Sequence, residues 1–435
     1  MARATRRRHH GLRIDMTSRI ESASLTSAPP EDTGVERGAL ERLDASFGER
    51  VEAGRMAGIV YAVARHGRLV HQSAIGKADI GTGRAMTPDT VFRLASMTKP
   101  VTAIALMMLH EEGLFALDDP LSAYLPAFAD IKVLPTLDAA PDDAVDLDRP
   151  ITIRHILQHN AGLGLGLGIG LTGEALLAKL DIYNPAHSLA DDVNNVAQVP
   201  LIYQPGTVWN YSLSPDIQAR LVEILSGEGF ADFLQKRIFG PLGMVDTGFA
   251  VRDDMADRVA SVYWREGETL TRWRDGAMPP LPPIISKWPQ PFFNLDNLDV
   301  VSERGSFGLY STIGDYLRFA QMLLNGGELD GVRIIGAATL DLMIADSIGD
   351  IPLLWPVQGL GFGLGFAVLR DPKAAGYAGT PGMFHWDGAL GTVMWVDRAR
   401  DLVVVGMAQH VLIEELTPDA LGAELRNHIY PALLD

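Results

Sequence analysis

The chain of 435 residues contains no cysteine. Disulfides, thiolate nucleophiles and cysteine-based metal sites are therefore excluded. Basic residues are scarce as well: 37 Lys and Arg stand against 54 Asp and Glu, which gives a formal net charge of −17. Because proteins that bind nucleic acids usually present a basic surface, this balance disfavours a nucleic-acid partner.

Long hydrophobic runs are absent too. No apolar segment reaches the roughly 18–20 residues that span a bilayer, so we expect no membrane partner. The first residues, MARATRRRHHGLRIDM, are basic but lack the apolar core of about 7–15 residues that a secretory signal peptide needs. We therefore predict a cytoplasmic protein whose residues 1–34 form a disordered tail.

The rest of the chain, with 47% hydrophobic residues overall, has the composition of a globular protein. Two strand-like runs flank the turn at His66-Gly67, and two more flank Arg398–Arg400 near the other end. The segments 38–55, 214–227 and 311–327 have the periodicity of amphipathic helices. This order predicts an α+β fold in which both ends of the chain build one central antiparallel sheet flanked by helices.

The middle of the chain is then an inserted, mainly helical lobe, and we expect the active site between this lobe and the sheet. In residue numbers, 35–115 and 300–435 form the sheet-containing domain and 116–299 form the helical domain. Residues 261–302 differ from their surroundings, being rich in proline and aromatic residues. They form either a packed loop or one wall of a pocket.

Ser96 and Lys99 open the stretch SMTKPVTAIALMM. On a helix, residues three apart share a face at roughly 5–6 Å between Cβ atoms, so the Lys99 amine can reach the Ser96 hydroxyl. Burial among apolar residues lowers the pKa of a lysine, and a neutral amine can accept the serine proton. Alternatively, Ser96 is a helix cap and Lys99 extends its amine to solvent. S-x-x-K arises by chance about once or twice in such a chain, so it decides nothing alone.

Several further landmarks follow in one order. They include VFRLASMTKPVTAIALMMLHEEGLFALDDPLSAYLP, ITIRHILQHNAGL, PGTVWNYSLSPD, FGPLGMVDTGF, GLYSTIGDYLRFAQMLLNGG and FHWDGALGTVMWVD. From about Gly38 to the C-terminus the sequence resembles the superfamily of serine β-lactamases and penicillin-binding proteins. Within it, the chain is most similar to class C β-lactamases and to family VIII carboxylesterases. The resemblance implies the β-lactamase-like fold, a serine nucleophile, no metal and no cofactor.

The second element of this superfamily, Tyr-x-Asn, corresponds to Tyr211-Ser212-Leu213. By resemblance, Tyr211 moves protons between Ser96, Lys99 and the leaving group. Without the other landmarks, Tyr211 reads as a packed loop tyrosine. The asparagine, which helps to hold the amide side chain of a β-lactam, is replaced by Leu213. This replacement counts against efficient binding of β-lactams and leaves ester chemistry intact.

The third element is Lys-Thr-Gly in β-lactamases and usually Trp-Gly-Gly in family VIII esterases. Here it is Trp386-Asp387-Gly388, followed by Ala389. Trp386 favours the esterase branch and either lines the acyl pocket or packs in the core, while Asp387 departs from both patterns. By resemblance, the backbone N–H groups of Ser96 and Ala389 form the oxyanion hole, and Gly388 permits close backbone approach.

Three rival sites are disfavoured. No serine has glycine at both −2 and +2, so the G-x-S-x-G nucleophile elbow is absent. His155 and His159, four apart, share a helix face, but the zincin pattern H-E-x-x-H is missing, so we expect no metal. The stretch GLGLGLGIG contains no complete G-x-G-x-x-G, and no G-K-[ST] follows it; the match GIGLTG, which runs past its end to Gly173, has no strand-like run directly before it. It is either a plain loop or one that gates the cleft.

The sequence thus predicts a serine hydrolase of carboxylic esters that works through an acyl-enzyme. The catalytic residues are Ser96, Lys99 and Tyr211. The substrate-binding residues are Leu213, Trp386, Asp387 and Gly388. An uncharged Trp386 beside an acid favours neutral, apolar esters with short- to medium-chain acyl groups, with β-lactams as a second substrate class. β-Lactamase or DD-peptidase activity on the same site, or a non-catalytic ligand-binding role, are the alternatives.

Overall fold

The structure is a computed structural model that describes residues 25–164, 171–180, 182, 184, 186–266, 268–274, 298, 301, 303–353, 358–411 and 418–434. Its centre is an eight-stranded sheet in the order β10-β11-β12-β13-β14-β1-β2-β3, with every neighbouring pair antiparallel. The strands are β1 (Gly58–Arg65), β2 (Arg68–Asp79), β3 (Arg84–Ala85), β10 (Leu360–Phe362), β11 (Ala367–Leu369), β12 (Phe384–Gly388), β13 (Thr392–Asp397) and β14 (Leu402–Ala408).

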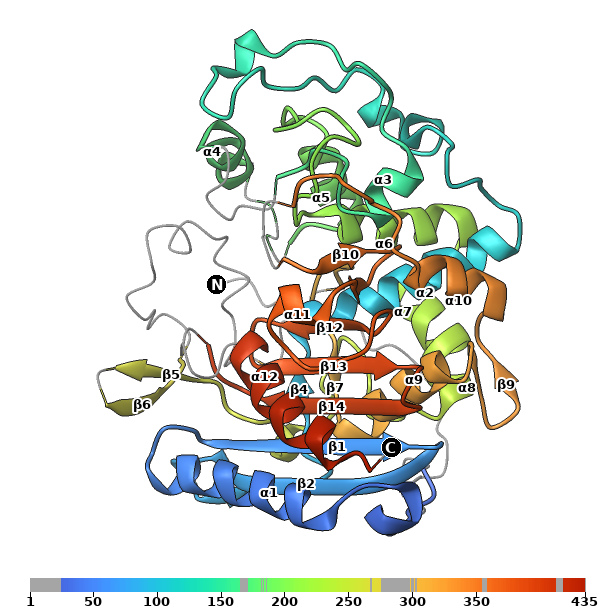
Figure 1. Ribbon diagram of the computed structural model, residues 1–435. Coiled ribbons are helices and arrows are strands. Elements are labelled where there is room, and N and C mark those ends of the chain that lie inside the picture. Colours follow the sequence, from blue (N-terminus) through green and yellow to red (C-terminus); the bar gives the residue numbers. More distant parts are fainter. Residues whose placement is uncertain are drawn as a thin grey trace.

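The sheet joins the two ends of the chain. β1, from the first quarter of the sequence, pairs with β14, which lies near the C-terminus, and Figure 1 shows these blue and red strands side by side. At the β1–β2 turn, His66 and Gly67 have φ of 55° and 70°, the left-handed values that a two-residue type I′ hairpin needs. The predicted α+β class and the antiparallel sheet built from both ends are confirmed.

Helices lie on both faces of this sheet, and their bounds are as follows. One layer is α1 (Arg37–Glu52), α11 (Pro372–Ala375) and α12 (Pro418–Ile429); α2 (Thr98–Glu111), α9 (Ile313–Leu324) and α10 (Ala337–Ile344) lie on the other side of the sheet. Along β1, Ile59, Tyr61 and Val63 pack in the core of α1 and α12, while Val60 and Ala62 pack in the core of α2 and α9. Burial on both faces explains why β1 reads as a continuous apolar run.

The helices of the middle of the chain up to residue 226 lie beyond α2, in teal and green at the top of Figure 1, while those of residues 230–242 lie at the right, near α2 and α9. Together they are α3 (Ile153–Leu157), α4 (Leu171–Lys179), α5 (Leu189–Val196), α6 (Ser214–Ser226), α7 (Phe230–Leu234), the π-helical turn η6 (Gln235–Phe239) and α8 (Gly240–Leu242). The core between α2 and the sheet continues without a break into these helices. The division into domains at the expected residue numbers therefore stays a prediction.

Two of the three short strand pairs that the described residues form outside the main sheet are hairpins. β5 (Tyr263–Glu266) and β6 (Thr269–Arg272) form a hairpin at the start of the proline- and aromatic-rich segment 261–302. Most of that segment, including residues 275–297, lies outside the described residues, as does the core of the glycine-rich stretch, 165–170. β8 (Glu328–Leu329) and β9 (Val332–Arg333) form a second hairpin after α9.

The expected disordered tail over residues 1–34 is wrong for residues 25–34. Leu25 is buried, the Ala28 N–H donates to the Leu69 carbonyl (3.0 Å), and residues 30–33 form a 3₁₀ turn. Apolar contacts and backbone pairing with β2 fix this segment, which its composition did not indicate; residues 1–24 lie outside the described chain. Among the helices that the described residues form, none combines the length and apolar character needed to cross a bilayer. The cytoplasmic location stays a prediction.

Candidate active site

Ser96 lies in a tight turn between strand and helix. β4 (Phe92–Arg93), paired with β7 (Tyr310–Ser311), leads into the 3₁₀ turn η2 (Ala95–Met97), which runs on into α2. Ser96 therefore precedes α2 rather than beginning it, because Ala95 takes a left-handed φ of 49° that an α-helix does not allow. Such a φ costs a non-glycine residue roughly 1–2 kcal/mol.

Hydrogen bonds from three elements hold this turn in place. The Leu94 N–H donates to the Leu309 carbonyl (2.8 Å), the Thr392 hydroxyl donates to the Leu94 carbonyl (2.9 Å), and the Tyr316 hydroxyl donates to the Met97 carbonyl (2.7 Å). Within the turn, the Met97 N–H donates to the Leu94 carbonyl and the Thr98 N–H to the Ala95 carbonyl. The Ser96 N–H takes no part in these hydrogen bonds, so it is an available donor at the N-terminus of α2.

The structure brings the three predicted catalytic side chains together. Lys99 Nζ lies 2.9 Å from Ser96 Oγ, and the Tyr211 hydroxyl donates to the same oxygen at 2.7 Å. Lys99 Nζ also lies 4.7 Å from the centre of the Tyr211 ring. Since Tyr211 comes from the loop before α6, 112 residues after Lys99, only the tertiary fold creates this group. Its geometry matches a serine nucleophile beside two groups through which its proton can move, the Lys99 amine as acceptor and the Tyr211 hydroxyl as donor.

Lys99 is buried, with 5% of its surface exposed. Loss of hydration lowers its pKa to about 7, and the negative charge of Asp216 opposes part of that shift. Lys99 Nζ donates a second hydrogen bond to the Ser306 carbonyl (2.7 Å). A substantial share of Lys99 is therefore a neutral amine near pH 7, which is the form that can accept the Ser96 proton.

The sequence analysis did not identify Asp216 or Ser306 as site residues. Asp216, in the first turn of α6, is buried and accepts hydrogen bonds from the Ser306 N–H (3.0 Å) and hydroxyl (2.6 Å). It thereby fixes the carbonyl that binds Lys99. The only sequence signal for Asp216 was its position five residues after Tyr211, and an acidic residue is common in the first turn of any helix.

Tyr211 lies among aromatic side chains. Burial raises the pKa of its hydroxyl, which favours the protonated form at neutral pH. The Trp386 ring lies 5.6 Å from the Tyr211 ring. The indole N–H of Trp386 is near enough to the Tyr211 oxygen to lower its pKa slightly, although no hydrogen bond of normal geometry joins them. Trp386 thus packs against the tyrosine of the site.

β12 places Gly388 and Ala389 beside the turn of Ser96. The pairing of β12 with β11 ends at His385, while its pairing with β13 continues to Gly388. Trp386–Gly388 therefore have a strand partner on one side only. A Cβ atom on Gly388 would lie 2.2 Å from the Leu94 carbonyl oxygen, which shows how closely β12 approaches the turn. Ala389, in the next turn, is exposed.

Replacing Gly388 by alanine should disable the site. The added methyl group would overlap both the Leu94 carbonyl and the Thr392 hydroxyl, each 2.2 Å away, and force β12 away from η2. Overpacking of this kind costs about 1–3 kcal/mol, and a displacement of ~1 Å in a catalytic site reduces the rate by about 10²-fold. We expect a lower Tm and a lower kcat for p-nitrophenyl acetate.

The matched control is Gly48→Ala, because an added Cβ there, on the surface of α1, meets no atom within 4 Å. Its activity and Tm should equal or exceed those of the wild type. An unchanged kcat in Gly388→Ala would show that β12 and the turn of Ser96 do not act as one unit.

Asp387 lies apart from the other three predicted residues of β12 and its turn. Successive side chains of a strand point to opposite faces, so Asp387 shares a face with His385 and not with Trp386. One Asp387 oxygen lies 4.0 Å from His385 Nδ1. The charge of Asp387 nevertheless contributes to raising the pKa of the Tyr211 hydroxyl, and its contact with substrate stays a prediction.

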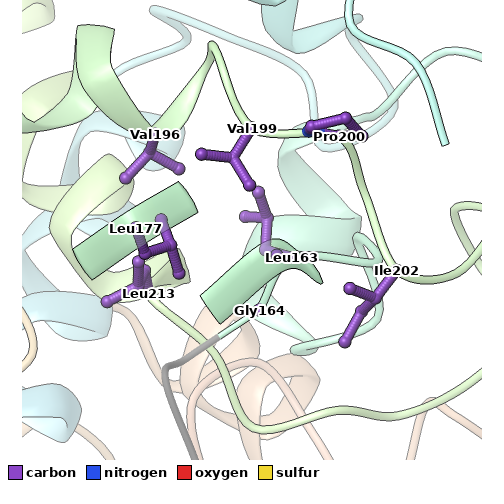
Figure 2. Close-up of a pocket in the computed structure, with 9 residues that line it drawn as sticks. Leu163, Gly164, Leu177, Val196, Val199, Pro200, Ile202 and Leu213 are labelled. Carbon is purple, nitrogen blue, oxygen red and sulfur yellow. The ribbon is translucent and has the colours of Figure 1, made fainter. Parts of the chain in front are cut away.

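Leu213 is buried and lines a small apolar cavity. Figure 2 shows its side chain facing Leu177 and Val196, with Leu163, Val199 and Ile202 around the same space. The cavity holds about 10 Å³, roughly the room for one water molecule. Leu213 is also the residue that precedes α6. An apolar wall thus stands where a Tyr-x-Asn motif would place an amide.

The two histidines do not share a helix face as expected. α3 ends at Leu157, and His159 has a left-handed φ of 55°, so the chain turns away between them. His155 instead accepts from the Thr152 N–H (3.2 Å) as part of the N-terminal cap of α3. Within the described part of the chain, no group of three or more His, Asp or Glu residues could hold a metal ion.

Comparison with known proteins identifies the family. The model of the family described as Beta-lactamase matches residues 43–423. Protein Rv1367c of Mycobacterium tuberculosis (strain ATCC 25618 / H37Rv) is 34% identical over 400 residues, 89% of this chain and 94% of that protein. Esterase EstB of Burkholderia gladioli is 34% identical over 375 residues, 84% of this chain and 88% of that protein.

A solved structure has the same fold. This structure is EstCE1, described as a hydrolase with promiscuous acyltransferase activity. It superposes with a TM-score of 0.74 at 27% identity, and the matched region covers 90% of this chain and 99% of EstCE1. The resemblance drawn from the sequence landmarks is thereby confirmed. The chain belongs to the β-lactamase family, in the superfamily of serine β-lactamases and penicillin-binding proteins, and to its family VIII esterase branch of serine hydrolases.

Proposed function

We propose that the protein hydrolyses carboxylic esters through an acyl-enzyme formed on Ser96. The observation that carries this proposal is the convergence of Lys99 Nζ and the Tyr211 hydroxyl on Ser96 Oγ, at 2.9 and 2.7 Å. Ser96 Oγ attacks the ester carbonyl as its proton passes to the pair of Lys99 and Tyr211. The tetrahedral intermediate then expels the alcohol, which leaves with that proton.

Deacylation reverses these roles. A water molecule in the position of the departed alcohol gives its proton to the same pair and attacks the acyl carbon. The bond to Ser96 Oγ breaks, and the serine recovers its proton as the carboxylic acid leaves. In both steps the N–H groups of Ser96 and Ala389 hold the oxyanion, a contribution worth about 10²–10³ in rate for each donor. The approach of β12 to the turn of Ser96 supports this assignment.

The substrate class is inferred from the residues that this chain carries at the two motif positions. Leu213 offers no amide to a β-lactam side chain, and Trp386 offers no cation to the carboxylate that β-lactams and peptidoglycan termini carry. The protein as a whole carries a net charge of −17, which further disfavours anionic substrates. Neutral, apolar esters with short- to medium-chain acyl groups fit best. The similarity to an esterase, EstB, agrees with this class.

A panel of p-nitrophenyl esters of increasing acyl length, measured beside nitrocefin, tests the substrate class. We expect kcat/KM for the best short-chain ester to exceed that for nitrocefin by at least about 10²-fold, since the site lacks both β-lactam contacts. The purified Ser96→Ala variant controls for contaminating esterases. A higher kcat/KM for nitrocefin would instead favour β-lactamase activity as the main function.

The non-catalytic alternative is separated from an enzyme by covalent labelling. A fluorophosphonate reacts with an activated serine, so the intact protein should gain the mass of one adduct and peptide mapping should place it on Ser96. Because Lys99 and Tyr211 both contact Ser96 Oγ, labelling should be lost when either Ser96 or Lys99 is replaced. A protein that only binds its ligand would not be labelled.

A further inference from the structure

His159 lies directly beneath the site, in a role that no step of the proposed mechanism uses. It follows α3 by two residues and is 2% exposed. Its left-handed φ of 55° is uncommon outside glycine, with histidine and asparagine among the side chains that tolerate it best. A buried histidine in a strained conformation needs surroundings that hold it there.

Hydrogen bonds join His159 to both neighbours of Tyr211. The Asn210 N–H donates to the His159 carbonyl at 2.8 Å. The Ser212 N–H donates to His159 Nδ1 at 3.2 Å, and the Ser212 hydroxyl lies 3.1 Å from the same nitrogen. Since Nδ1 accepts from a backbone N–H, the ring proton is on Nε2. The backbone on both sides of Tyr211 is thus anchored to one residue.

The imidazole also packs against the Tyr211 ring. The two ring centres are 5.2 Å apart. The imidazole lies nearly parallel to the Trp386 indole, at 8° and 6.4 Å, and meets Phe362 edge to face at 5.5 Å. Trp209 closes this aromatic group on the other side, 6.0 Å away. These contacts leave the Tyr211 ring little freedom to turn about its side-chain bonds.

The electrostatic surroundings keep His159 neutral. Burial, together with the nearby charge of Lys99, lowers its pKa to about 3. With Nδ1 occupied by Ser212 and the pKa so far below neutrality, the imidazole does not exchange protons during turnover at pH 6–9. Its contribution is therefore one of geometry.

We propose that His159 is the positioning residue of Tyr211: it anchors Asn210 and Ser212 and packs against the phenol ring, so that the Tyr211 hydroxyl stays 2.7 Å from Ser96 Oγ. This inference rests on the proposed function, because it assigns a role relative to a catalytic tyrosine. It does not make His159 a catalytic residue, since its described hydrogen bonds go to Asn210 and Ser212 and not to Ser96 Oγ.

A double-mutant cycle with Tyr211→Phe tests this role. His159→Phe keeps a ring but loses the Nδ1 acceptor, and we expect kcat for p-nitrophenyl acetate to fall by about 10–10²-fold while KM changes by less than about threefold. In the Tyr211→Phe background the same change should alter kcat by less than about twofold, because there is no hydroxyl left to position. His159→Asn, which retains an acceptor near Nδ1 and tolerates positive φ, should recover most of the loss.

His155→Phe is the matched control, since it removes the same kind of bond, from the Thr152 N–H to an imidazole Nδ1, outside the aromatic group. It should lower Tm and leave kcat unchanged. Should His159→Phe fail to fold, His159→Gln takes its place in the cycle, because its amide reaches toward the Nε2 position and leaves the Ser212 N–H without its acceptor.

Equal losses of kcat in both backgrounds, or a His159→Asn variant no better than His159→Phe, would overturn the positioning role. In either case we would still expect Tyr211→Phe by itself to lower kcat. If Tyr211→Phe had no effect on kcat, the proposed function would be at fault instead, so the two failures are distinguishable.

Discussion

Ser96→Ala is expected to abolish ester hydrolysis while the protein remains folded. Without Oγ no acyl-enzyme can form, and loss of a serine nucleophile lowers kcat by about 10⁴-fold or more. The fold should tolerate the change, because Ser96 Oγ serves mainly Lys99 and Tyr211, and Lys99 Nζ keeps its hydrogen bond to the Ser306 carbonyl. The measurements are kcat with p-nitrophenyl acetate, circular dichroism and Tm.

Ser226→Ala provides the comparison for this experiment. Ser226 is half-buried and its hydroxyl bonds the Val222 carbonyl (2.6 Å) at the far end of α6, so its removal tests the general effect of deleting a buried hydroxyl. We expect its kcat to stay within about twofold of the wild type. Ordinary turnover by Ser96→Ala, in a preparation free of other esterases, would refute the assignment of the nucleophile.

Much of the fold could be predicted from patterns that local chemistry enforces. The His66-Gly67 turn and the apolar runs around it predict the β1–β2 hairpin, and the apolar positions Leu40, Leu43 and Phe47 predict the buried face of α1. Residues 25–34 were not recognisable, since a single bridge from Ser27 to Leu69 and a few backbone bonds fix them. Contacts of this kind leave no periodic trace in a sequence.

The site divides in the same way. Ser96 and Lys99 could be identified because three residues of spacing bring them together locally, and Tyr211 because the order of landmarks matches a family. His159 and Asp216 act through the backbone N–H and hydroxyl groups of Ser212 and Ser306, which lie far from them in the sequence or carry no recognisable motif. Nothing in the one-dimensional pattern marks such partners. The opposite facing of Asp387 follows from strand alternation once β12 is known to be a strand.

The activity should fall as the pH drops below about 7, because Lys99 then becomes charged and can no longer accept the Ser96 proton. Burial lowers the pKa of Lys99 to about 7. Below that pH the neutral fraction, and with it kcat/KM, should decline about tenfold per pH unit. The buried histidines His159 and His385 do not account for a decline of kcat/KM in this pH range, since burial lowers the pKa of each to about 3. Measurements of kcat/KM from pH 5 to 9 give the midpoint.

Asp216→Asn tests whether Lys99 causes this loss of kcat/KM at low pH, through the direction in which the midpoint moves. The Asp216 carboxylate favours the charged form of Lys99, so its neutralisation should lower the pKa of Lys99 and move the midpoint of kcat/KM to lower pH. Asparagine retains one oxygen for Ser306, which limits the structural change. Asp146→Asn, at an exposed carboxylate that pairs only with the surface Lys132, should leave the midpoint in place. A midpoint that stayed fixed in Asp216→Asn, or moved upward, would show that a group other than Lys99 is the base, because removal of a nearby negative charge can only make a buried lysine easier to deprotonate.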